Sequence, residues 1–362
     1  MTAAATFRAQ FPVLQQVAYL NSGTEGPMPV AAVTAVRERL ERDAADGRAG
    51  RAYFDTVLGL AAASRAAYAE VLGADPSEVA LTGSTTDGLN TVLGGLSFAA
   101  GDEIITSDEE HPGMIAPLRL ARMRHGVRIR IVPFDGLAGA VGPSTRLIAC
   151  SHVSWFGGKV ADVGGLVATG IPVLLDAAQA LGAIPVDVHA LGVDFYAGSG
   201  QKWLCGPEGS GCLYVRPDRL ADLEPPWPGY ATLDERKTVD AELAEGTGRL
   251  DVGFPAAIRS AAALAALETL RAPGWTWVHE RAAALAEQLA ELLAGGGLEV
   301  APRGRSTLVS WRTTDPEADV TRLAAAGIVI RSIPSAGLLR ASVGAWNSED
   351  DIERLAAAAA AR

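Results

Sequence analysis

Cysteine is scarce in this sequence. Cys150, Cys205 and Cys212 are the only three in 362 residues, and no two of them form a C-x-x-C pair. The five histidines do not pair with them at the spacing of zinc ligands. We therefore expect free thiols in a reducing, cytoplasmic setting, and no metal site.

Basic tracts and long apolar runs are also lacking. Lysine and arginine number 31 against 42 acidic residues, which gives a net charge of 31 − 42 = −11. An acidic chain without a basic patch disfavours binding to nucleic acid or to anionic lipid. No run of about 18 apolar residues is present to span a membrane, and the N-terminus lacks a signal-peptide pattern. We therefore expect neither nucleic acid nor a membrane as a partner.

What the chain does have is a series of short apolar stretches that end in polar residues. They cover residues 79–82, 103–106, 146–150, 172–175, 193–197 and 211–215. Helical patterns occur before and between them. Apolar strands that alternate with helices indicate an α/β fold with a mostly parallel central sheet and helices on both faces. Because ligands of such sheets bind beyond the carboxyl ends of the strands, the polar residues there are candidates for a site.

The character of the chain changes near residue 254. The segment from Glu224 to Tyr230 is rich in proline and predicts a stiff hinge or lid. Alanine- and leucine-rich helices then mix with short strands, which indicates a smaller α+β domain. We predict an N-terminal segment over residues 1–20 that packs with the small domain, a large α/β domain over 21–254 that carries the site, and a small α+β domain over 255–362.

Lys202 is the first candidate for chemistry. It lies in the block from Gly198 to Leu204, whose other residues are small, polar or aromatic. Taken alone, it could be a lysine at a strand end with its ammonium in water. Asp176 precedes it by 202 − 176 = 26 residues, about one strand–helix–strand unit. A carboxylate and an amine at neighbouring strand ends suit pyridoxal 5′-phosphate, whose aldehyde needs the amine and whose ring nitrogen needs an anion.

Other parts of such a site can also be found. Ser84, Thr85 and Thr86 follow a strand and open a helix, where free N–H groups and the helix dipole favour a phosphate. One of them could simply be the helix cap, and Asp176 could likewise be an N-cap. His111 is either a flat ring against the cofactor or a loop histidine before a proline. Each signal is weak alone, and their shared order along the chain favours the cofactor site.

Several segments match, in order, those of one known family. They are residues 83–90 (GSTTDGLN), 108–111 (DEEH), 151–154 (SHVS), 176–179 (DAAQ), 199–203 (SGQKW), 340–342 (RAS) and 347–352 (NSEDDI). In them the sequence resembles the class V aminotransferase superfamily of fold-type I pyridoxal phosphate enzymes. It looks closest to the cysteine/cystine C–S lyases and the isopenicillin N epimerase-like members. The resemblance implies the fold-type I architecture and a homodimer with its active site at the interface.

The resemblance assigns roles to named residues. Lys202 would hold the cofactor as a Schiff base and move the proton at the substrate Cα. Asp176 would pair with the pyridine nitrogen, and His111 would stack on the ring. The other cofactor contacts are expected from Thr85, Thr86, Gln179, Ser199 and Gln201, with Gln179 at the ring oxygen and the rest at the phosphate.

The substrate is expected to be an amino acid, bound as a small molecule. Arg340 would take its α-carboxylate, since a guanidinium offers two parallel donors, and Arg331 is a second candidate for substrate binding. The chain also departs from the family pattern. Trp155 stands where desulfurases have an asparagine that contacts the ring oxygen. Phe254 stands where a threonine usually reaches the phosphate of the neighbouring subunit.

The loop before Arg340 bears on the reaction. A desulfurase needs a nucleophilic cysteine there, and residues 332–339 contain none, so we expect the chain not to be a cysteine desulfurase. The leading hypothesis is a C–S lyase that eliminates the β-substituent of cysteine, cystine or a cysteine conjugate. Transamination and epimerisation stay open as alternatives. A protein that binds the cofactor without catalysis is a distant alternative, disfavoured by the presence of Lys202 and Asp176.

Overall fold

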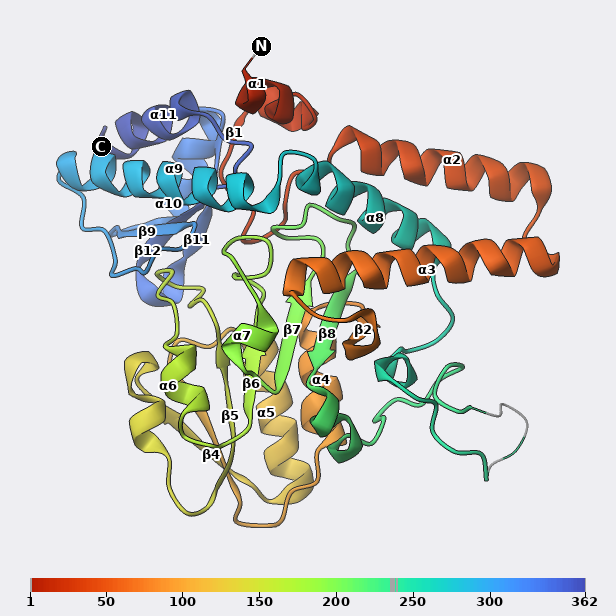
Figure 1. The fold of residues 1–362 in the computed structure, drawn as a ribbon. Coiled ribbons are helices and arrows are strands. Elements are labelled where there is room, and N and C mark those ends of the chain that lie inside the picture. The colour runs from red at the N-terminus through yellow and green to blue at the C-terminus, as the bar shows by residue number, and fades with distance from the viewer. Residues whose placement is uncertain (1, 235–237, 239, 362) are drawn as a thin grey trace.

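The centre of the molecule is a sheet of seven strands. A computed structural model describes residues 2–234, 238 and 240–361, and Figure 1 shows its arrangement. The strand order is β2-β8-β7-β6-β5-β3-β4. In chain order the strands are β2 (Val79–Thr82), β3 (Glu103–Ser107), β4 (Arg128–Val132), β5 (Thr145–Ser151), β6 (Val173–Asp176), β7 (Phe195–Ser199) and β8 (Gly211–Val215). The run from β7 to β4 is parallel and β8 is antiparallel to both its neighbours, which confirms the predicted mostly parallel sheet.

The middle strands are apolar because both of their faces are covered. Along β5, Ile148 and Cys150 face one hydrophobic core, while Leu147 and Ala149 face another. Successive side chains of a strand point to opposite faces. A strand buried on both sides therefore reads as a continuous apolar run rather than as an alternating one.

Helices cover the two faces of this sheet. One face carries α4 (Thr85–Gly95) and α5 (Pro112–His125), whose buried side chains share a core with the sheet. On the other face lie α3 (Gly50–Leu72), α6 (Val163–Val167) and α7 (Val188–Leu191). Figure 1 shows α3 beside α2 (Val30–Asp46) and α8 (Ala257–Arg271), which pack against one another away from the sheet. The strand ends between these layers stay free for a site.

A second, smaller sheet lies beside the first, drawn in blue in Figure 1. Its strand order is β11-β12-β9, and all pairs are antiparallel. The elements of this part are α9 (Trp275–Gly295), β9 (Leu308–Arg312), α10 (Pro316–Ala325), β10 (Ile328–Val329), β11 (Arg331–Ile333), β12 (Leu338–Ser342) and α11 (Glu349–Ala360). They enclose their own hydrophobic core. The position of β12 matters most, since it carries Arg340 toward the larger sheet.

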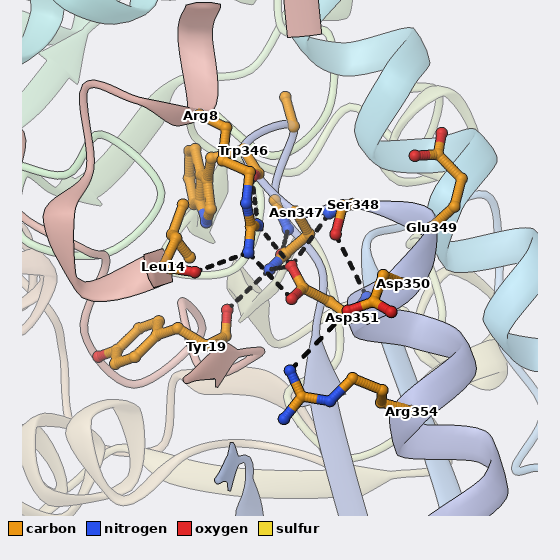
Figure 2. Close-up of polar contacts among 12 residues, drawn as sticks. Arg8, Leu14, Tyr19, Trp346, Asn347, Ser348, Glu349, Asp350, Asp351 and Arg354 are labelled. Atoms are coloured by element: carbon orange, nitrogen blue, oxygen red, sulfur yellow. Dashed lines mark hydrogen bonds and ion pairs between the residues drawn. The ribbon is translucent and has the colours of Figure 1, made fainter. Parts of the chain in front are cut away.

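The N-terminal segment is attached to this smaller part. Strand β1 (Ala18–Tyr19) pairs in parallel with β10. Figure 2 shows Arg8, at the end of α1 (Ala3–Arg8), donating to both carboxylate oxygens of Asp351 at 2.5 and 3.1 Å. Asn347 Nδ2 donates to the carbonyl of Tyr19 at 3.0 Å. These contacts place the segment against α11, while the domain boundaries at residues 20 and 254 stay a prediction.

Two further findings concern the described residues as a whole. None of their helices is long and apolar enough to cross a membrane. They also contain no group of three or more histidine, cysteine, aspartate or glutamate side chains arranged to hold a metal ion.

Candidate active site

Lys202 and Asp176 meet at the carboxyl ends of neighbouring strands. Asp176 is the last residue of β6, and Lys202 lies just beyond β7, which pairs with β6 in parallel. Burial lowers the pKa of Lys202 to about 8, with the charge of Asp176 acting in the opposite direction and those of Arg340 and Arg331 adding to the lowering. About a tenth of this amine is therefore neutral at pH 7, far more than for an ordinary lysine, and the neutral amine is the nucleophilic form.

Asp176 is a buried carboxylate without a full counter-charge. Burial raises its pKa, while Lys202 and a hydrogen bond from the Ala178 N–H at 2.8 Å lower it. The contact with Ala178 shows that the carboxylate also caps a local turn. The alternative considered from the sequence, a helix N-cap, is wrong, because residues 178–180 form a turn and no helix begins there. A cationic partner such as a protonated ring nitrogen would complete its environment, because opposite charges favour the ionised form.

The start of α4 is held against the end of β7. The Thr85 N–H donates to Ser199 Oγ at 3.0 Å, and the two hydroxyls lie 2.7 Å apart. Ser84 is the helix cap, since its hydroxyl accepts from the Asp87 N–H at 3.1 Å. The cap therefore uses only one of the three hydroxyl residues, and Thr85 and Thr86 remain in the first turn. Such a turn presents N–H groups to an anion.

Gln201 lies on the same side. Its backbone carbonyl accepts from the Gly26 N–H at 2.7 Å, which ties the loop after β1 to the segment that carries Lys202. The side-chain oxygen Oε1 is buried, with no hydrogen-bond partner among the described residues. A polar atom left in that state is costly, so Oε1 is available to a group that donates a hydrogen bond.

His111 is the N-cap of α5 and is neutral at physiological pH. Burial, together with the charges of Lys202, Arg331 and Arg340, lowers its pKa to about 4. Its Nδ1 accepts from the Gly113 N–H at 3.0 Å. The neutral ring must therefore carry its hydrogen on Nε2, so it can donate a hydrogen bond but cannot act as a base through Nδ1.

Gln179 is engaged by the protein on both ends of its amide. Its Nε2 donates to the Gly23 carbonyl at 2.8 Å, and its Oε1 accepts from Trp203 Nε1 at 3.1 Å. The predicted contact with a ring oxygen would have to use the second hydrogen on Nε2. These partners come from distant segments, and no sequence pattern indicated either of them.

Arg340 is a buried cation that forms no ion pair with an acidic residue in the described part of the chain. Its side chain is fully buried, with an exposed fraction of 0%. Nη1 donates to the Trp155 carbonyl at 2.8 Å, while Nε and Nη2 have no partner among the described residues. Burial and the neighbouring Arg331 lower its pKa to about 9, so it stays protonated at neutral pH. Such an arrangement calls for an anionic ligand.

Arg331 lies directly across from Arg340, because the two are paired in the register of β11 and β12. Its guanidinium lies 5.7 Å from the centre of the Trp155 ring, and Nη1 is 3.4 Å from Thr24 Oγ1. Two neighbouring guanidinium groups therefore face the region of Lys202 and His111. The arrangement can bind the carboxylate of an amino acid bidentately.

The loop over residues 22–26 was read from the sequence only as a break between elements, and it forms one wall of the site. A Cβ at Gly23 would lie 2.7 Å from both Gln179 Oε1 and Ser342 Oγ, and 3.0 Å from Arg340 Nη2. Only glycine fits without displacing these groups. Ser342 Oγ is itself buried with no partner among the described residues, which makes it a further candidate that the sequence did not indicate.

The cysteines take no part in this arrangement. Cys150, Cys205 and Cys212 are all free and buried. Burial raises the pKa of Cys150 and Cys205 well above the usual range, and that of Cys212 to about 12. Thiols in this state are poor nucleophiles.

Comparisons with known proteins agree on one family. The family model for class V aminotransferases matches residues 18–355. A cysteine desulfurase from Cronobacter sakazakii is 31% identical, with 97% of this chain and 96% of that protein covered. A probable cysteine desulfurase from Methanothermobacter thermautotrophicus is 29% identical over 96% of this chain and 95% of that protein.

Two further similarities widen the range of reactions. Isopenicillin N epimerase from Streptomyces clavuligerus is 34% identical over 59% of this chain and 57% of that protein. Among solved structures, the cystine C–S lyase C-DES in complex with its product cysteine persulfide has a TM-score of 0.92 at 30% identity, covering 97% of this chain and 99% of that one. Another C-DES structure, with glycine covalently linked to the pyridoxal phosphate cofactor, has a TM-score of 0.93.

These findings correct one expectation. We expected the chain not to be a cysteine desulfurase, and that exclusion is wrong, because relatives that match nearly the whole chain are named cysteine desulfurases. The exclusion rested on the lack of cysteine in residues 332–339. The lack of cysteine there means only that this loop cannot itself accept the sulfur. It does not bear on how the substrate is bound or how its Cα proton is removed.

Proposed function

This chain belongs to the class V aminotransferase family of pyridoxal phosphate-dependent enzymes, and from that premise we propose that it cleaves the C–S bond of cysteine, cystine or a related amino acid. The observation that carries the proposal is a pair of buried charged groups. Lys202 only partly offsets the charge of Asp176, and Nε and Nη2 of Arg340 have no partner among the described residues. When bound, pyridoxal phosphate supplies an electron sink for negative charge at the substrate Cα.

The residues present fit this cofactor. The buried carboxylate of Asp176 suits a protonated ring nitrogen. Thr85 and Thr86 in the first turn of α4, with Ser199 beside them, suit a phosphate. Gln201 would have to donate to it from Nε2, because its buried, unpartnered Oε1 is an acceptor. We propose that these residues hold the phosphate, and that Gln179 contacts the ring oxygen.

Lys202 is proposed as the group that moves the proton. Its lowered pKa of about 8 leaves enough neutral amine to bind the cofactor aldehyde and, once released from it, to take the proton from Cα. His111 is proposed to lie flat against the ring. Because it is neutral and donates only from Nε2, it adds no charge and does not compete with Lys202 for the proton.

Arg340 and Arg331 are proposed to orient the substrate. Nε and Nη2 of Arg340 have no protein acceptor among the described residues, so they are available to the two oxygens of an α-carboxylate. Fixing the carboxylate leaves the Cα–H bond to face Lys202 and the side chain to carry the sulfur leaving group. Positioning of this kind supplies much of the rate enhancement in such reactions.

Two outcomes of C–S cleavage are supported by different relatives. Elimination from cystine, with water, would give pyruvate, ammonia and cysteine persulfide, and the similarity to the cystine C–S lyase C-DES supports it. Desulfuration of cysteine would give alanine and pass the sulfur to an acceptor thiol, and the relatives named cysteine desulfurases support it. We favour elimination, because the free thiols of the described chain are buried and poorly placed to accept sulfur. Desulfuration would therefore need a thiol acceptor from outside the protein.

The cofactor can be located without knowing the substrate. The sequence has lysine only at positions 159, 202 and 237, so borohydride reduction followed by peptide mapping gives an unambiguous answer. Label on Lys202, and none in the Lys202→Ala variant, is expected. A protein that takes up no pyridoxal phosphate, or is labelled elsewhere, would refute the proposed site.

The reaction is tested by product analysis. Wild-type protein is incubated with cystine and with cysteine plus a dithiol acceptor, and pyruvate, ammonia, alanine and sulfide are measured. Pyruvate and ammonia in equal amounts support elimination, whereas alanine identifies desulfuration. Keto-acid exchange or a change of Cα configuration, with no sulfur released, would replace the proposal by transamination or epimerisation.

We further propose a cytoplasmic homodimer. An exposed aromatic cluster supports the dimer: Phe54 on α3 and Phe254 are 47% and 39% exposed and their rings lie 5.7 Å apart, with Tyr230 5.8 Å from Phe254. Large exposed apolar groups that gather in one place often mark a protein interface. Phe254→Ser should weaken association in sedimentation experiments. A wild-type chain that sediments as a monomer would contradict the proposal.

A further inference from the structure

Trp155 contacts several of the predicted site residues at once. Its ring lies 5.0 Å from that of His111, at an interplanar angle of 86°. Arg331 lies over the same ring at 5.7 Å. Its backbone carbonyl accepts the hydrogen bond from Arg340 Nη1. Trp155 therefore contacts His111 and Arg331 through its ring and Arg340 through its backbone carbonyl.

The indole has little freedom to move. It stacks on Phe156 with 4.7 Å between ring centres and an interplanar angle of 30°. The carbonyl of Phe156 accepts from Ser310 Oγ at 2.5 Å, which anchors this turn to β9. Trp155 is thus a rigid support that extends from the large sheet to the small one.

Arg331 and Arg340 need such a support because they repel each other. They occupy paired positions on neighbouring strands, and the presence of Arg331 lowers the pKa of Arg340. No ion pair joins either of them to a carboxylate in the described part of the chain. A carboxylate would hold a guanidinium in place, but it would also neutralise the charge and occupy the donors. An aromatic ring attracts the cation through its face and leaves the N–H groups free.

We propose that Trp155 is a positioning residue for substrate binding, which holds the guanidinium of Arg331 beside Arg340 so that both can face the anionic group of an amino acid. This inference rests on the proposed function only in that the ligand is an α-amino acid. It does not depend on which bond of that ligand is broken.

Glycine is a suitable probe, because it carries the amino and carboxylate groups and has no leaving group. Its affinity for the cofactor-loaded protein is measured from the change in the cofactor absorbance on titration. Trp155→Leu removes the ring and should weaken glycine binding about tenfold. Trp155→Phe keeps an aromatic face and should stay within about threefold of wild type. Affinity for pyridoxal phosphate itself should change less than twofold in both, roughly within the scatter expected of an uncoupled site.

Trp275 provides a matched control. Like the Nε1 of Trp155, its Nε1 is buried with no partner among the described residues, and its ring also stacks on a neighbour, His279, at 5.8 Å. It belongs to α9 and lines a separate groove with Ala63 and Leu267. Trp275→Leu should leave glycine binding unchanged, so a loss specific to Trp155→Leu reports on the site rather than on the loss of a tryptophan.

A double-mutant cycle tests whether Trp155 acts through Arg331. In the Arg331→Gln background, adding Trp155→Leu should weaken glycine binding by less than about twofold, since the partner is already gone. A full tenfold loss in that background would overturn the proposal, because Trp155 would then act on the ligand directly. Unchanged glycine binding in Trp155→Leu would overturn it as well.

The proposed function and this inference can fail separately. If cystine and cysteine release no sulfur but glycine binds and the cycle is non-additive, the positioning role stands and the reaction is a different one. If wild-type protein cleaves cystine but shows no spectral response to glycine, the placement of the carboxylate at the two arginines is refuted.

Discussion

Glu110 allows a quantitative test of how the strand ends are held together. The residue precedes His111, and its side chain is 7% exposed. Its Oε1 accepts from Ser107 Oγ at 2.5 Å and from the Ser151 N–H at 3.0 Å. Its Oε2 accepts from Ser151 Oγ at 2.6 Å. Since Ser151 is paired with Asp176 in the register of β5 and β6, Glu110 links three strand ends beneath the site.

The buried carboxyl should make the stability of the protein depend on pH. Burial raises the pKa of Glu110 from 4.5 to about 7, with Asp176 adding to the rise and the hydrogen bonds from Ser107 and Ser151 opposing it. The unfolded chain ionises this group at lower pH than the folded protein does. Its stabilising contribution is therefore complete below pH 4.5 and is lost as the pH rises through about 7. The full loss in the free energy of unfolding is about 3 kcal/mol.

Glu110→Gln removes the ionisation and can keep every hydrogen bond, because the amide oxygen still accepts and the amide N–H can donate to Ser151 Oγ. Between about pH 5.5 and about pH 8.5, the free energy of unfolding of the wild type should fall by about 2 kcal/mol relative to that of the variant. The assay is urea unfolding of the cofactor-free proteins at both pH values. Glu110→Gln would then be the more stable protein at the higher pH.

Glu109→Gln is the matched variant in the same loop. Glu109 is paired with Lys159 at 2.8 Å, so losing its charge should lower the free energy of unfolding by up to about 1 kcal/mol instead of raising it. If the difference between wild type and Glu110→Gln is the same at both pH values, burial does not control the ionisation of Glu110, and the reasoning is refuted.

Three other predictions follow from the site and from the N-terminal segment. The rate at which cofactor-free protein takes up pyridoxal phosphate, followed by stopped-flow absorbance, should rise with pH and level off just above pH 8. The reason is that burial lowers the pKa of Lys202 to about 8 and the neutral amine is the reactive form. A rate that continues to rise toward pH 10.5 would contradict this prediction. Arg340→Lys should raise KM for cystine about 10- to 100-fold with little change in the cofactor spectrum, because an ammonium cannot replace a bidentate guanidinium; an unchanged KM would exclude Arg340 from the carboxylate site. Asp351→Asn should destabilise the protein by about 2 kcal/mol in urea unfolding, since it leaves Arg8 without its buried partner; an effect below about 0.5 kcal/mol would show that the pair adds little.

The features that sequence predicted well are those encoded locally. The apolar run over residues 172–175 became β6, and the polar residue at its end, Asp176, lies where the rule for parallel sheets places it. The spacing between Asp176 and Lys202 fits one crossover, so their meeting could be expected. The hydrophobic period, the turn residues and the strand ends all depend on residues a few positions apart. A single sequence is enough to show them.

The contacts that were not predicted join segments far apart along the chain. Gln179 and the Gly23 carbonyl are separated by 156 residues, and Arg340 and the Trp155 carbonyl by 185. No local pattern marks such pairs, because their proximity follows from how the smaller sheet docks on the larger one. Trp155 was noted only as a departure from a motif, although its contacts give it a place in the site.

The groups that the protein leaves unsatisfied define the ligand more narrowly than the fold does. Asp176 is a buried carboxylate whose charge is only partly offset, and Arg340 is a buried guanidinium that forms no ion pair with a carboxylate in the part of the chain that the structure describes. Either one, left alone, would cost several kcal/mol. A ligand that relieves both must present a cation near β6 and an anion near β12, which a cofactor ring joined to an α-amino acid does. A simple amine fails this requirement because it leaves Arg340 unpaired, so it should bind far more weakly than the corresponding amino acid. The specificity for amino acids that we propose thus follows from two charges that the fold holds apart and does not fully neutralise.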